Sequence, residues 1–252
     1  MWLGTLWRSE EMNRKLLTAV VLALSLGWIQ VASAAVTDAI RLTSGGQIAT
    51  IVDNLPCVGA CVGLTGDLNP AMGTTTVSGT LNGWTLNITS GTSHSPNLSP
   101  FGLDITTLTA SCGVAGGCTG ANDLHVIFSD INFAVPVAAG GFATTYSATI
   151  TGPGSTSESA FVDNSNTLFG EPGAGLIGTV GPFFAPFGAG SATGGPAGVP
   201  NYSLTLDQVF DGAGSSFSAD GNITTPEPST IALLGTALVG LGWLGRRRRM
   251  KV

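Results

Sequence analysis

The chain lacks positive charge except near its two ends. Residues 35–225 contain no lysine and a single arginine, Arg41, against twelve carboxylates, so this stretch carries a formal charge of −11. The whole chain of 252 residues carries −6. Because proteins bind nucleic acids by neutralising phosphates with lysine and arginine, we expect no nucleic-acid partner. The surface polarity must come from serine, threonine, asparagine and aspartate, which gives few salt bridges and weak charge steering.

Groups suited to acid–base chemistry are also scarce. His94 lies in a polar loop pattern, and His125 occupies a strand position that we expect to face solvent or a polar edge. A Ser/His/Asp triad needs three groups within hydrogen-bond reach, and no nucleophile-elbow motif indicates one. Glu158 and Glu171 could form the carboxylate pair of a glycosidase, but their Ser/Thr and Gly/Pro surroundings favour exposure to solvent. We therefore predict no catalytic residue, and expect that the protein is not an enzyme.

No spacing typical of a metal site is present, so we predict no metal and no cofactor. Calcium is the alternative, because residues 163–166 and Asp211 together with residues 220–222 offer oxygen ligands. Neither set has the EF-hand spacing, and Asx turns explain both equally well.

Cysteine is limited to two close pairs, Cys57 with Cys61 and Cys112 with Cys118. Export to an oxidising compartment predicts disulfides, and four cysteines allow three pairings. We favour the two local pairs, because each loop contains glycine and can close on itself. The alternatives are disulfides between the two loops, or a zinc site that these spacings fit poorly.

The N-terminus reads as a secretory signal. Asn13-Arg14-Lys15 forms a positive region, residues 16–29 are apolar, and Val31-Ala32-Ser33-Ala34 offers small residues at the cleavage positions. Cleavage is predicted between Ala34 and Ala35, which makes residues 1–34 the signal peptide. Met12 begins the positive region directly, which suggests that translation starts there. An uncut signal anchor is the alternative.

The C-terminus has three parts in a fixed order: a proline-stiffened tripeptide, an apolar run and four arginines. We predict a transmembrane helix at residues 231–245, short enough that snorkelling arginines extend its reach. Since basic residues stay on the cytoplasmic side, the tripeptide would emerge outside. A core helix with a solvated basic end is the alternative. The parts are, in order, Pro226, Glu227 and Pro228, then the span, then Arg246, Arg247, Arg248 and Arg249.

This arrangement resembles the PEP-CTERM sorting signal, over about a tenth of the chain. Pro226, Glu227 and Pro228 match the tripeptide that gives the signal its name. The resemblance implies export in a Gram-negative bacterium that makes extracellular polysaccharide. It also implies an exosortase, a membrane enzyme thought to cut near the tripeptide and pass the protein to the cell surface or matrix. The inner membrane and the secretion machinery would be transient partners.

Residues 35–221 are predicted to form one all-β domain, an antiparallel β-sandwich of eight or more strands, with residues 222–252 as linker and sorting tail. The clearest element is a hairpin over residues 74–89, because Asn82-Gly83 favours a type I′ turn. Folding about this turn pairs Leu81 with Trp84, Gly79 with Leu86 and Val77 with Ile88. Further strands are expected at 40–42, 48–52, 102–108, 124–128, 142–150, 158–162, 167–169, 202–206 and 216–219.

Residues 170–200 are rich in glycine and proline and are predicted to form a long loop. We expect Phe183, Phe184 and Phe187 to tuck it onto the sandwich; a flexible insert or a phenylalanine-lined ligand groove are the alternatives. For the whole protein we expect a structural or adhesive role at the cell surface, with extracellular polysaccharide as a partner. A secreted carbohydrate-active enzyme and a non-catalytic carbohydrate-binding module are the alternatives.

Overall fold

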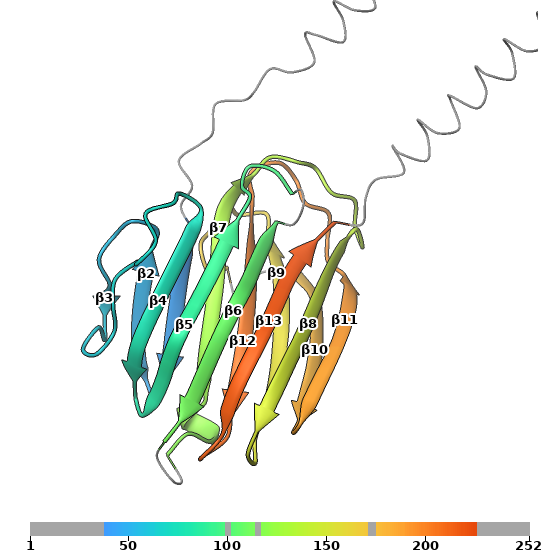
Figure 1. Ribbon diagram of the computed structural model, residues 1–252. Helices are drawn as coiled ribbons and strands as arrows, with labels where there is room; N and C mark the ends of the chain where they lie inside the picture. The colour runs from blue at the N-terminus through green and yellow to red at the C-terminus, as the bar shows by residue number, and fades with distance from the viewer. Residues whose placement is uncertain (1–37, 99–101, 114–116, 171–174, 226–252) are drawn as a thin grey trace, which may run out of the picture. The chain divides into compact units, whose positions relative to one another are not determined.

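The computed structural model describes residues 38–98, 102–113, 117–170 and 175–225 (Figure 1). These residues form thirteen strands in two antiparallel sheets, which confirms the predicted β-sandwich. Sheet A has the order β10-β9-β12-β7-β1-β2-β3, and sheet B has the order β11-β8-β13-β6-β5-β4. The strands are β1 Ala39–Ser44, β2 Gln47–Val52, β3 Val58–Gly59, β4 Thr74–Leu81, β5 Trp84–Ser93, β6 Leu103–Cys112, β7 Leu124–Phe133, β8 Phe142–Thr151, β9 Ser155–Asp163, β10 Gly175–Phe184, β11 Phe187–Gly194, β12 Tyr202–Asp211 and β13 Ser216–Thr224.

The core lies between the two sheets, where alternate residues of each strand meet. Trp84, Phe210 and Phe217 pack against one another, and the Trp84 indole N–H donates to the carbonyl of Asn122 at 2.9 Å. Phe133, Tyr202 and Phe142 form a second aromatic group. Because all six rings are almost wholly buried, they supply much of the apolar area that stabilises the sandwich.

The β4–β5 hairpin forms about Asn82-Gly83 as predicted, with both residues at positive φ. Leu81 pairs with Trp84, and Gly79 pairs with Leu86. The third predicted pair is wrong, because Val77 pairs with Thr89 and not with Ile88. Residues 87 and 88 face a single residue on each neighbouring strand, which is a β-bulge in β5. A bulge inserts one residue and shifts the register beyond it.

The glycine-rich stretch after residue 170 contains two strands joined by a short turn, which corrects the predicted loop. The first strand, β10, is the edge of sheet A, and the second, β11, is the edge of sheet B, so the two strands close one side of the sandwich (Figure 1). A Cβ on Gly178 would clash with Ala192, and one on Gly188 would clash with Phe183. The glycines therefore allow the two strands to approach closely, rather than making the segment flexible.

The strand predicted at residues 167–169 is absent, because these residues form part of a turn between β9 and β10. This turn packs onto the outer face of sheet A. Phe169 contacts Ala39 and Ile127, and the guanidinium carbon of Arg41 lies 3.8 Å from the Phe169 ring centroid. The backbone N–H of Phe169 donates to Ser129 Oγ at 3.1 Å, which fixes the turn on the sheet.

The predicted disulfides are confirmed: Cys57 pairs with Cys61, and Cys112 pairs with Cys118. At the C-terminal boundary, β13 continues to Thr224 with Ile223 buried, so residues 222–224 belong to the sandwich and not to the linker. Among the described residues, no helix has the length and apolar character of a membrane span. The predicted signal peptide and the transmembrane helix at 231–245 lie outside these residues.

Both ends of the described chain lie at the same end of the sandwich. Asp38, which precedes β1, lies close enough to Asp130 for the two carboxyls to influence each other's charge. Asp130 accepts from Ser93 Oγ at 2.5 Å, and Ser93 pairs with Leu103, which in turn pairs with Ile223 near the end of β13. The sorting motif therefore begins at the same end of the sandwich as the place where the chain enters it (Figure 1).

Candidate functional site

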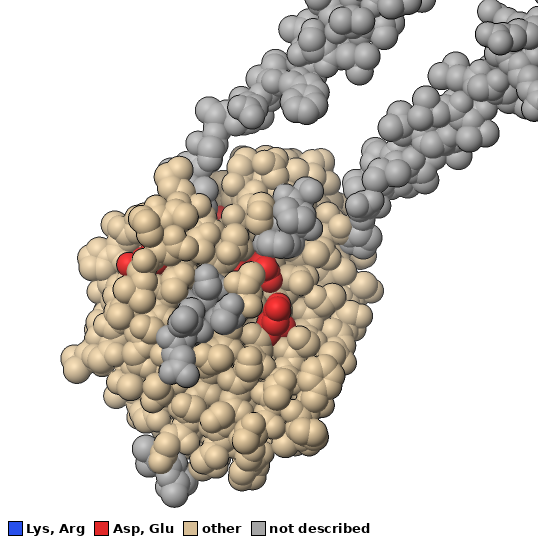
Figure 2. All heavy atoms as spheres, viewed as in Figure 1, with Lys and Arg blue, Asp and Glu red and all other residues tan. Residues whose placement is uncertain are grey.

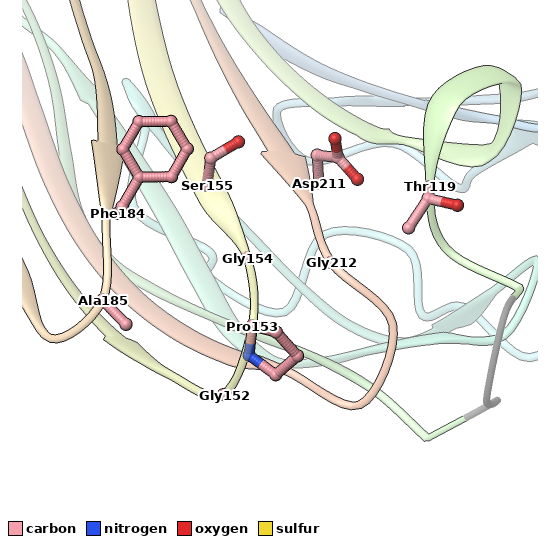
Figure 3. A pocket seen from close by; sticks show the side chains of 9 residues that line it. All are labelled: Thr119, Gly152, Pro153, Gly154, Ser155, Phe184, Ala185, Asp211 and Gly212. Carbon is pink, nitrogen blue, oxygen red and sulfur yellow. The ribbon is translucent and has the colours of Figure 1, made fainter.

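The opposite end of the sandwich carries a pocket of about 480 Å³ (Figure 3). Figure 3 shows Phe184, Ser155 and Asp211 side by side on the neighbouring strands β10, β9 and β12. The β8–β9 turn forms the floor, where a Cβ on Gly154 would lie 2.7 Å from the Asp211 carbonyl. The lining residues are Thr119, Gly152, Pro153, Gly154, Ser155, Phe184, Ala185, Asp211 and Gly212.

This end pocket combines an exposed aromatic ring with polar groups. Phe184 is 65% exposed, which is unusual for a large apolar side chain, and the Asp211 carboxylate and the Ser155 hydroxyl lie on the adjoining strands. An aromatic face packs against apolar C–H surfaces, while carboxylates and hydroxyls accept or donate hydrogen bonds. The arrangement suits a neutral polyhydroxylated ligand such as a sugar.

A smaller groove of about 190 Å³ lies on the outer face of sheet B. It is lined by hydroxyl side chains, by the exposed ring of Phe187 and by Asp220. Figure 2 shows acidic side chains gathered near the middle of this face and no lysine or arginine on it. The groove therefore has the same chemistry as the end pocket, in a shallower form. Its hydroxyl groups come from Thr106, Ser147, Thr149 and Ser218.

Two neighbouring carboxyls on this face, Asp104 of β6 and Asp220 of β13, have altered acidity. Burial raises the pKa of Asp104 to about 6, and the charge of Asp220 adds to this effect. Burial also raises the pKa of Asp220. Sequence patterns did not single out this pair, because the two residues are more than a hundred positions apart and only the β6–β13 pairing joins their strands.

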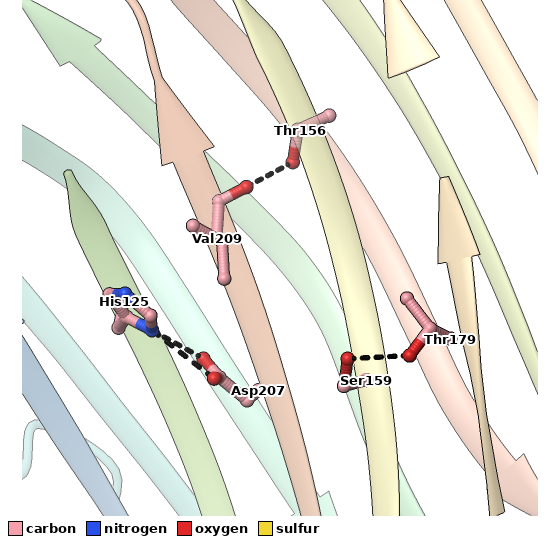
Figure 4. A network of polar contacts seen from close by, with 6 residues as sticks. All are labelled: His125, Thr156, Ser159, Thr179, Asp207 and Val209. Carbon is pink, nitrogen blue, oxygen red and sulfur yellow. Dashed lines mark hydrogen bonds and ion pairs between the residues drawn. The ribbon is translucent and has the colours of Figure 1, made fainter. Parts of the chain in front are cut away.

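His125 faces outward as predicted and contacts Asp207, with its Nδ1 3.1 Å from both carboxylate oxygens (Figure 4). A hydrolytic triad would place the histidine between the aspartate and a serine. Here the nearest serine across the strand, Ser159, lies on β9 on the far side of Asp207, and its Oγ is 3.0 Å from Thr179 Oγ1. These side chains do not assemble a Ser/His/Asp relay.

Glu158 is wholly buried, which corrects the prediction that it faces solvent. It alternates along β9 with exposed or partly exposed positions and points into the core with Thr156, Ala160 and Val162. Burial raises its pKa to about 8. Hydrogen bonds from Thr144 and Gln208 lower the pKa, but their effect is smaller than that of burial. The second predicted glycosidase carboxylate, Glu171, lies outside the described residues, so no Glu158–Glu171 pair can be placed.

The oxygen-rich segment at residues 163–166 forms turns. Asp163 Oδ1 accepts from the backbone N–H of Ser165 at 2.8 Å, an Asx turn, and Asn166 exchanges hydrogen bonds with Asn132. Asp211 ends β12 in sheet A, whereas Asp220 lies in β13 of sheet B, so this predicted ligand set is not brought together. Within the described ranges, no group of three or more acidic, histidine or cysteine side chains has the arrangement of a metal site.

The residues of the two predicted processing sites lie outside the described part of the chain. They are Ala32, Ala34 and Ala35 at the signal cleavage site, Pro226, Glu227 and Pro228 in the tripeptide, and Arg246, Arg247, Arg248 and Arg249. For the tail, comparison with known families is decisive: the PEP-CTERM protein-sorting motif matches residues 224–249. The chain carries a PEP-CTERM sorting motif at its C-terminal end. The motif makes it an exported protein that an exosortase handles at the membrane.

Other comparisons of this chain reach only its fold. A search of curated proteins found no match. Among solved structures, it is similar to TmCBM61 in complex with β-1,4-galactotriose, at 9% identity over 48% of this chain and 83% of that one, with a TM-score of 0.26. The N-terminal cellulose-binding domain of Cellulomonas fimi β-1,4-glucanase C matches at 17% identity over 48% and 79%, with a TM-score of 0.27.

The enzymatically active domain of bacteriophage CBA120 tailspike protein 4 matches at 14% identity, with a TM-score of 0.29. The match covers 57% of this chain but only 19% of the tailspike chain. All three structural likenesses are too distant to carry an argument about function.

Proposed function

We propose that this chain is a non-enzymatic, structural or adhesive protein of the cell surface or extracellular matrix of a Gram-negative bacterium, and that it contacts neutral polysaccharide. The observation that carries the proposal is that the two ends of the sandwich carry different features. The sorting motif follows β13 at one end, and the end pocket with Phe184 and Asp211 opens at the other. The pocket and the residue from which the tail continues therefore lie at opposite ends of the sandwich.

The surface chemistry supports a polysaccharide rather than a charged ligand. Arg41 is the single basic residue between positions 35 and 225, and its guanidinium lies over the Phe169 ring. An acidic polymer would meet a surface of its own sign, whereas neutral sugars offer apolar faces to Phe184 and hydroxyls to Asp211 and Ser155.

The ligand is tested with the exported chain on an array of extracellular polysaccharides. Phe184→Ala and Asp211→Asn should each lower binding at least about tenfold, since each removes one anchor of the pocket. The matched control is Val62→Ala, which removes an exposed apolar side chain elsewhere on the surface. Unchanged binding by both pocket variants, or loss with the control, would exclude the end pocket.

The sorting route is tested by replacing Pro226, Glu227 and Pro228 with alanine. We expect the unprocessed protein to stay in the inner membrane, because the exosortase no longer finds its recognition tripeptide. Unchanged delivery to the surface would contradict this step.

A second candidate, a carbohydrate-active enzyme, is favoured by one observation: Asp104, with its pKa raised to about 6, lies near Asp220 on a face that also holds a groove. A pair of neighbouring carboxyls, one of which has its pKa raised toward neutrality, is a starting point for a general acid and its partner. Turnover of a polysaccharide that Asp104→Asn or Asp220→Asn abolishes would establish this candidate and overturn the non-enzymatic proposal.

A further inference from the structure

Three polar side chains meet in the core between the sheets and have no role in the proposed function. They are Thr144 of β8, Glu158 of β9 and Gln208 of β12, and each is 0% exposed. Thr144 Oγ1 lies 2.7 Å from Glu158 Oε1, and Gln208 Nε2 lies 2.9 Å from Glu158 Oε2. One carboxyl group therefore bridges a hydroxyl from sheet B and a primary amide from sheet A.

The carboxyl is held without a cation. No lysine occurs between residues 35 and 225, and Arg41 lies on the outer face of sheet A, so Glu158 has no basic partner in the core. Burial raises its pKa to about 8, and the carboxyl is therefore neutral at neutral pH. A neutral carboxyl can accept a proton on one oxygen and donate a proton from the other, so it can act as both general base and general acid.

The surrounding backbone is shaped for this group. A Cβ on Gly221 would clash with Glu158 Oε2 and would come within 2.6 Å of Gln208 Nε2, so only glycine leaves room here. Thr144 Oγ1 also lies 3.0 Å from the carbonyl of Asn222, which holds the hydroxyl in place. In contrast, Gln208 Oε1 is buried without a hydrogen-bond partner, so the amide is the unsatisfied member of the group.

We propose that Thr144 and Gln208 form an intramolecular ester cross-link, with Glu158 as the proton-transferring catalytic residue. Thr144 Oγ1 attacks the amide carbon of Gln208, and its proton passes to Glu158 Oε1. The amide nitrogen donates to Glu158 Oε2 before the attack, becomes basic in the tetrahedral intermediate, and then takes a proton from the Glu158 carboxyl. The Oγ1–Cδ bond forms, the Cδ–N bond breaks and ammonia leaves. The carboxyl ends neutral, and no oxidant, reductant or further reactant is needed.

The location favours both formation and persistence of this ester. Burial holds the three side chains in one place, which favours reaction between them. The same burial excludes the water that would hydrolyse the ester. Because β8 lies in sheet B and β12 in sheet A, the bond joins the two sheets covalently. An amide cross-link of this kind would need a lysine, which this stretch lacks.

The test is mass spectrometry of the full chain, produced with its own export signal in a Gram-negative host. After denaturation, reduction and alkylation of the cysteines, and digestion with pepsin, we expect one species that joins the β8 and β12 segments. Its mass should be lower than that of the two peptides by one ammonia. Alkaline hydroxylamine, which cleaves esters but not amides, should separate the two and leave a hydroxamate on Gln208.

Variants test the three roles. Thr144→Val and Glu158→Gln should abolish the joined species, whereas Thr144→Ser, which keeps the hydroxyl, should retain it. Thr145→Val is the matched control, since Thr145 is the exposed neighbour on the same strand. The wild-type digest decides the matter independently of how the variants fold. Separate β8 and β12 peptides at full mass, from protein that is folded before digestion, would overturn the proposal.

Discussion

The two sides of the sandwich are built in opposite ways. The side that contains β4 and β5 is packed with large apolar side chains, including Trp84 and Leu86, around a tight Asn-Gly turn. On the other side, the edge strands β10 and β11 approach their neighbours through glycines such as Gly188, and the adjoining strand β9 buries the polar Glu158. The first side is stabilised mainly by apolar burial, and the second by close backbone approach and hydrogen bonds.

This difference shows that low hydrophobicity in an exported β-protein does not imply a loose segment. Strands β10 and β11 have few large buried side chains, yet a Cβ at Gly178, Gly188 or Gly194 would meet atoms of the facing strand at less than the normal contact distance. We expect the two sides to be destabilised by opposite changes in side-chain volume. Substitutions that remove atoms should destabilise the apolar side, and substitutions that add atoms should destabilise the glycine-rich side.

Trp84→Ala should have the largest effect, with a loss of about 4 kcal/mol in the free energy of unfolding. The side chain is 0% exposed, contacts Phe217 and donates to the Asn122 carbonyl, so truncation leaves a cavity and removes one of the two hydrogen bonds to that carbonyl, the other being from Ser44 Oγ. Urea denaturation followed by circular dichroism measures the loss. Trp84→Phe is the control, because it keeps most of the volume and should cost less than half as much.

Gly188→Val should cost about 3 kcal/mol, because the new side chain has to displace Phe183 from its stack on Tyr146. The same substitution at Gly113, where a Cβ meets nothing within 4 Å, is the matched control and should change stability by less than about 0.5 kcal/mol. Equal denaturation midpoints for the two variants would mean that β10 and β11 are not closely packed.

The buried carboxyl of Glu158 predicts a pH dependence on the polar side. Its ordinary pKa is 4.5 and burial raises the pKa in the folded state to about 8, so the folded protein holds one more proton between these values. Its contribution to stability is complete below about pH 4.5 and is lost as the pH rises toward 8, with a slope of up to about 1.4 kcal/mol per pH unit. Urea denaturation at a series of pH values should show a shallower decline for Glu158→Gln. An unchanged slope would place the carboxyl in water.

The same contrast explains what could be predicted from the sequence. The β4–β5 turn and its first two pairs follow from Asn82-Gly83 and the alternation around it, because turn type and hydrophobic period act locally. The bulge at residues 87 and 88 could not be predicted, since it depends on how β5 pairs with both neighbours. Strands β10 and β11 were missed because glycine, which usually marks loops, serves there to allow close approach of the two strands.

The functional sites also divide into those formed by residues close in sequence and those assembled by the fold. The tail could be identified because its parts are adjacent in the sequence, and the local disulfides because each loop is short. The Thr144–Glu158–Gln208 group and the end pocket join residues from strands that only the sheet order brings together. One signal for Glu158 was present, however: Ala160 and Val162 set the inward phase of β9, and Glu158 is in that phase.

Gly83→Ala should cost about 1 kcal/mol, because a residue with a Cβ is disfavoured at the φ of +85° that this turn position requires. Differential scanning calorimetry should show a lower midpoint without a change in the shape of the transition. The control is Thr85→Ala, an exposed position in the same hairpin. If Gly83→Ala is as stable as the control, the turn is not of type I′.

Phe184→Ala should have the smallest effect on stability, a change of less than about 0.5 kcal/mol, although it removes a whole aromatic ring. The ring is 65% exposed in the end pocket, whereas the Trp84 ring is 0% exposed, so removal opens no cavity in the core. Urea denaturation of the two alanine variants side by side checks this contrast. A loss above about 1 kcal/mol for Phe184→Ala would mean that the ring packs against the sandwich, and an aromatic anchor for a ligand would then be missing from the pocket.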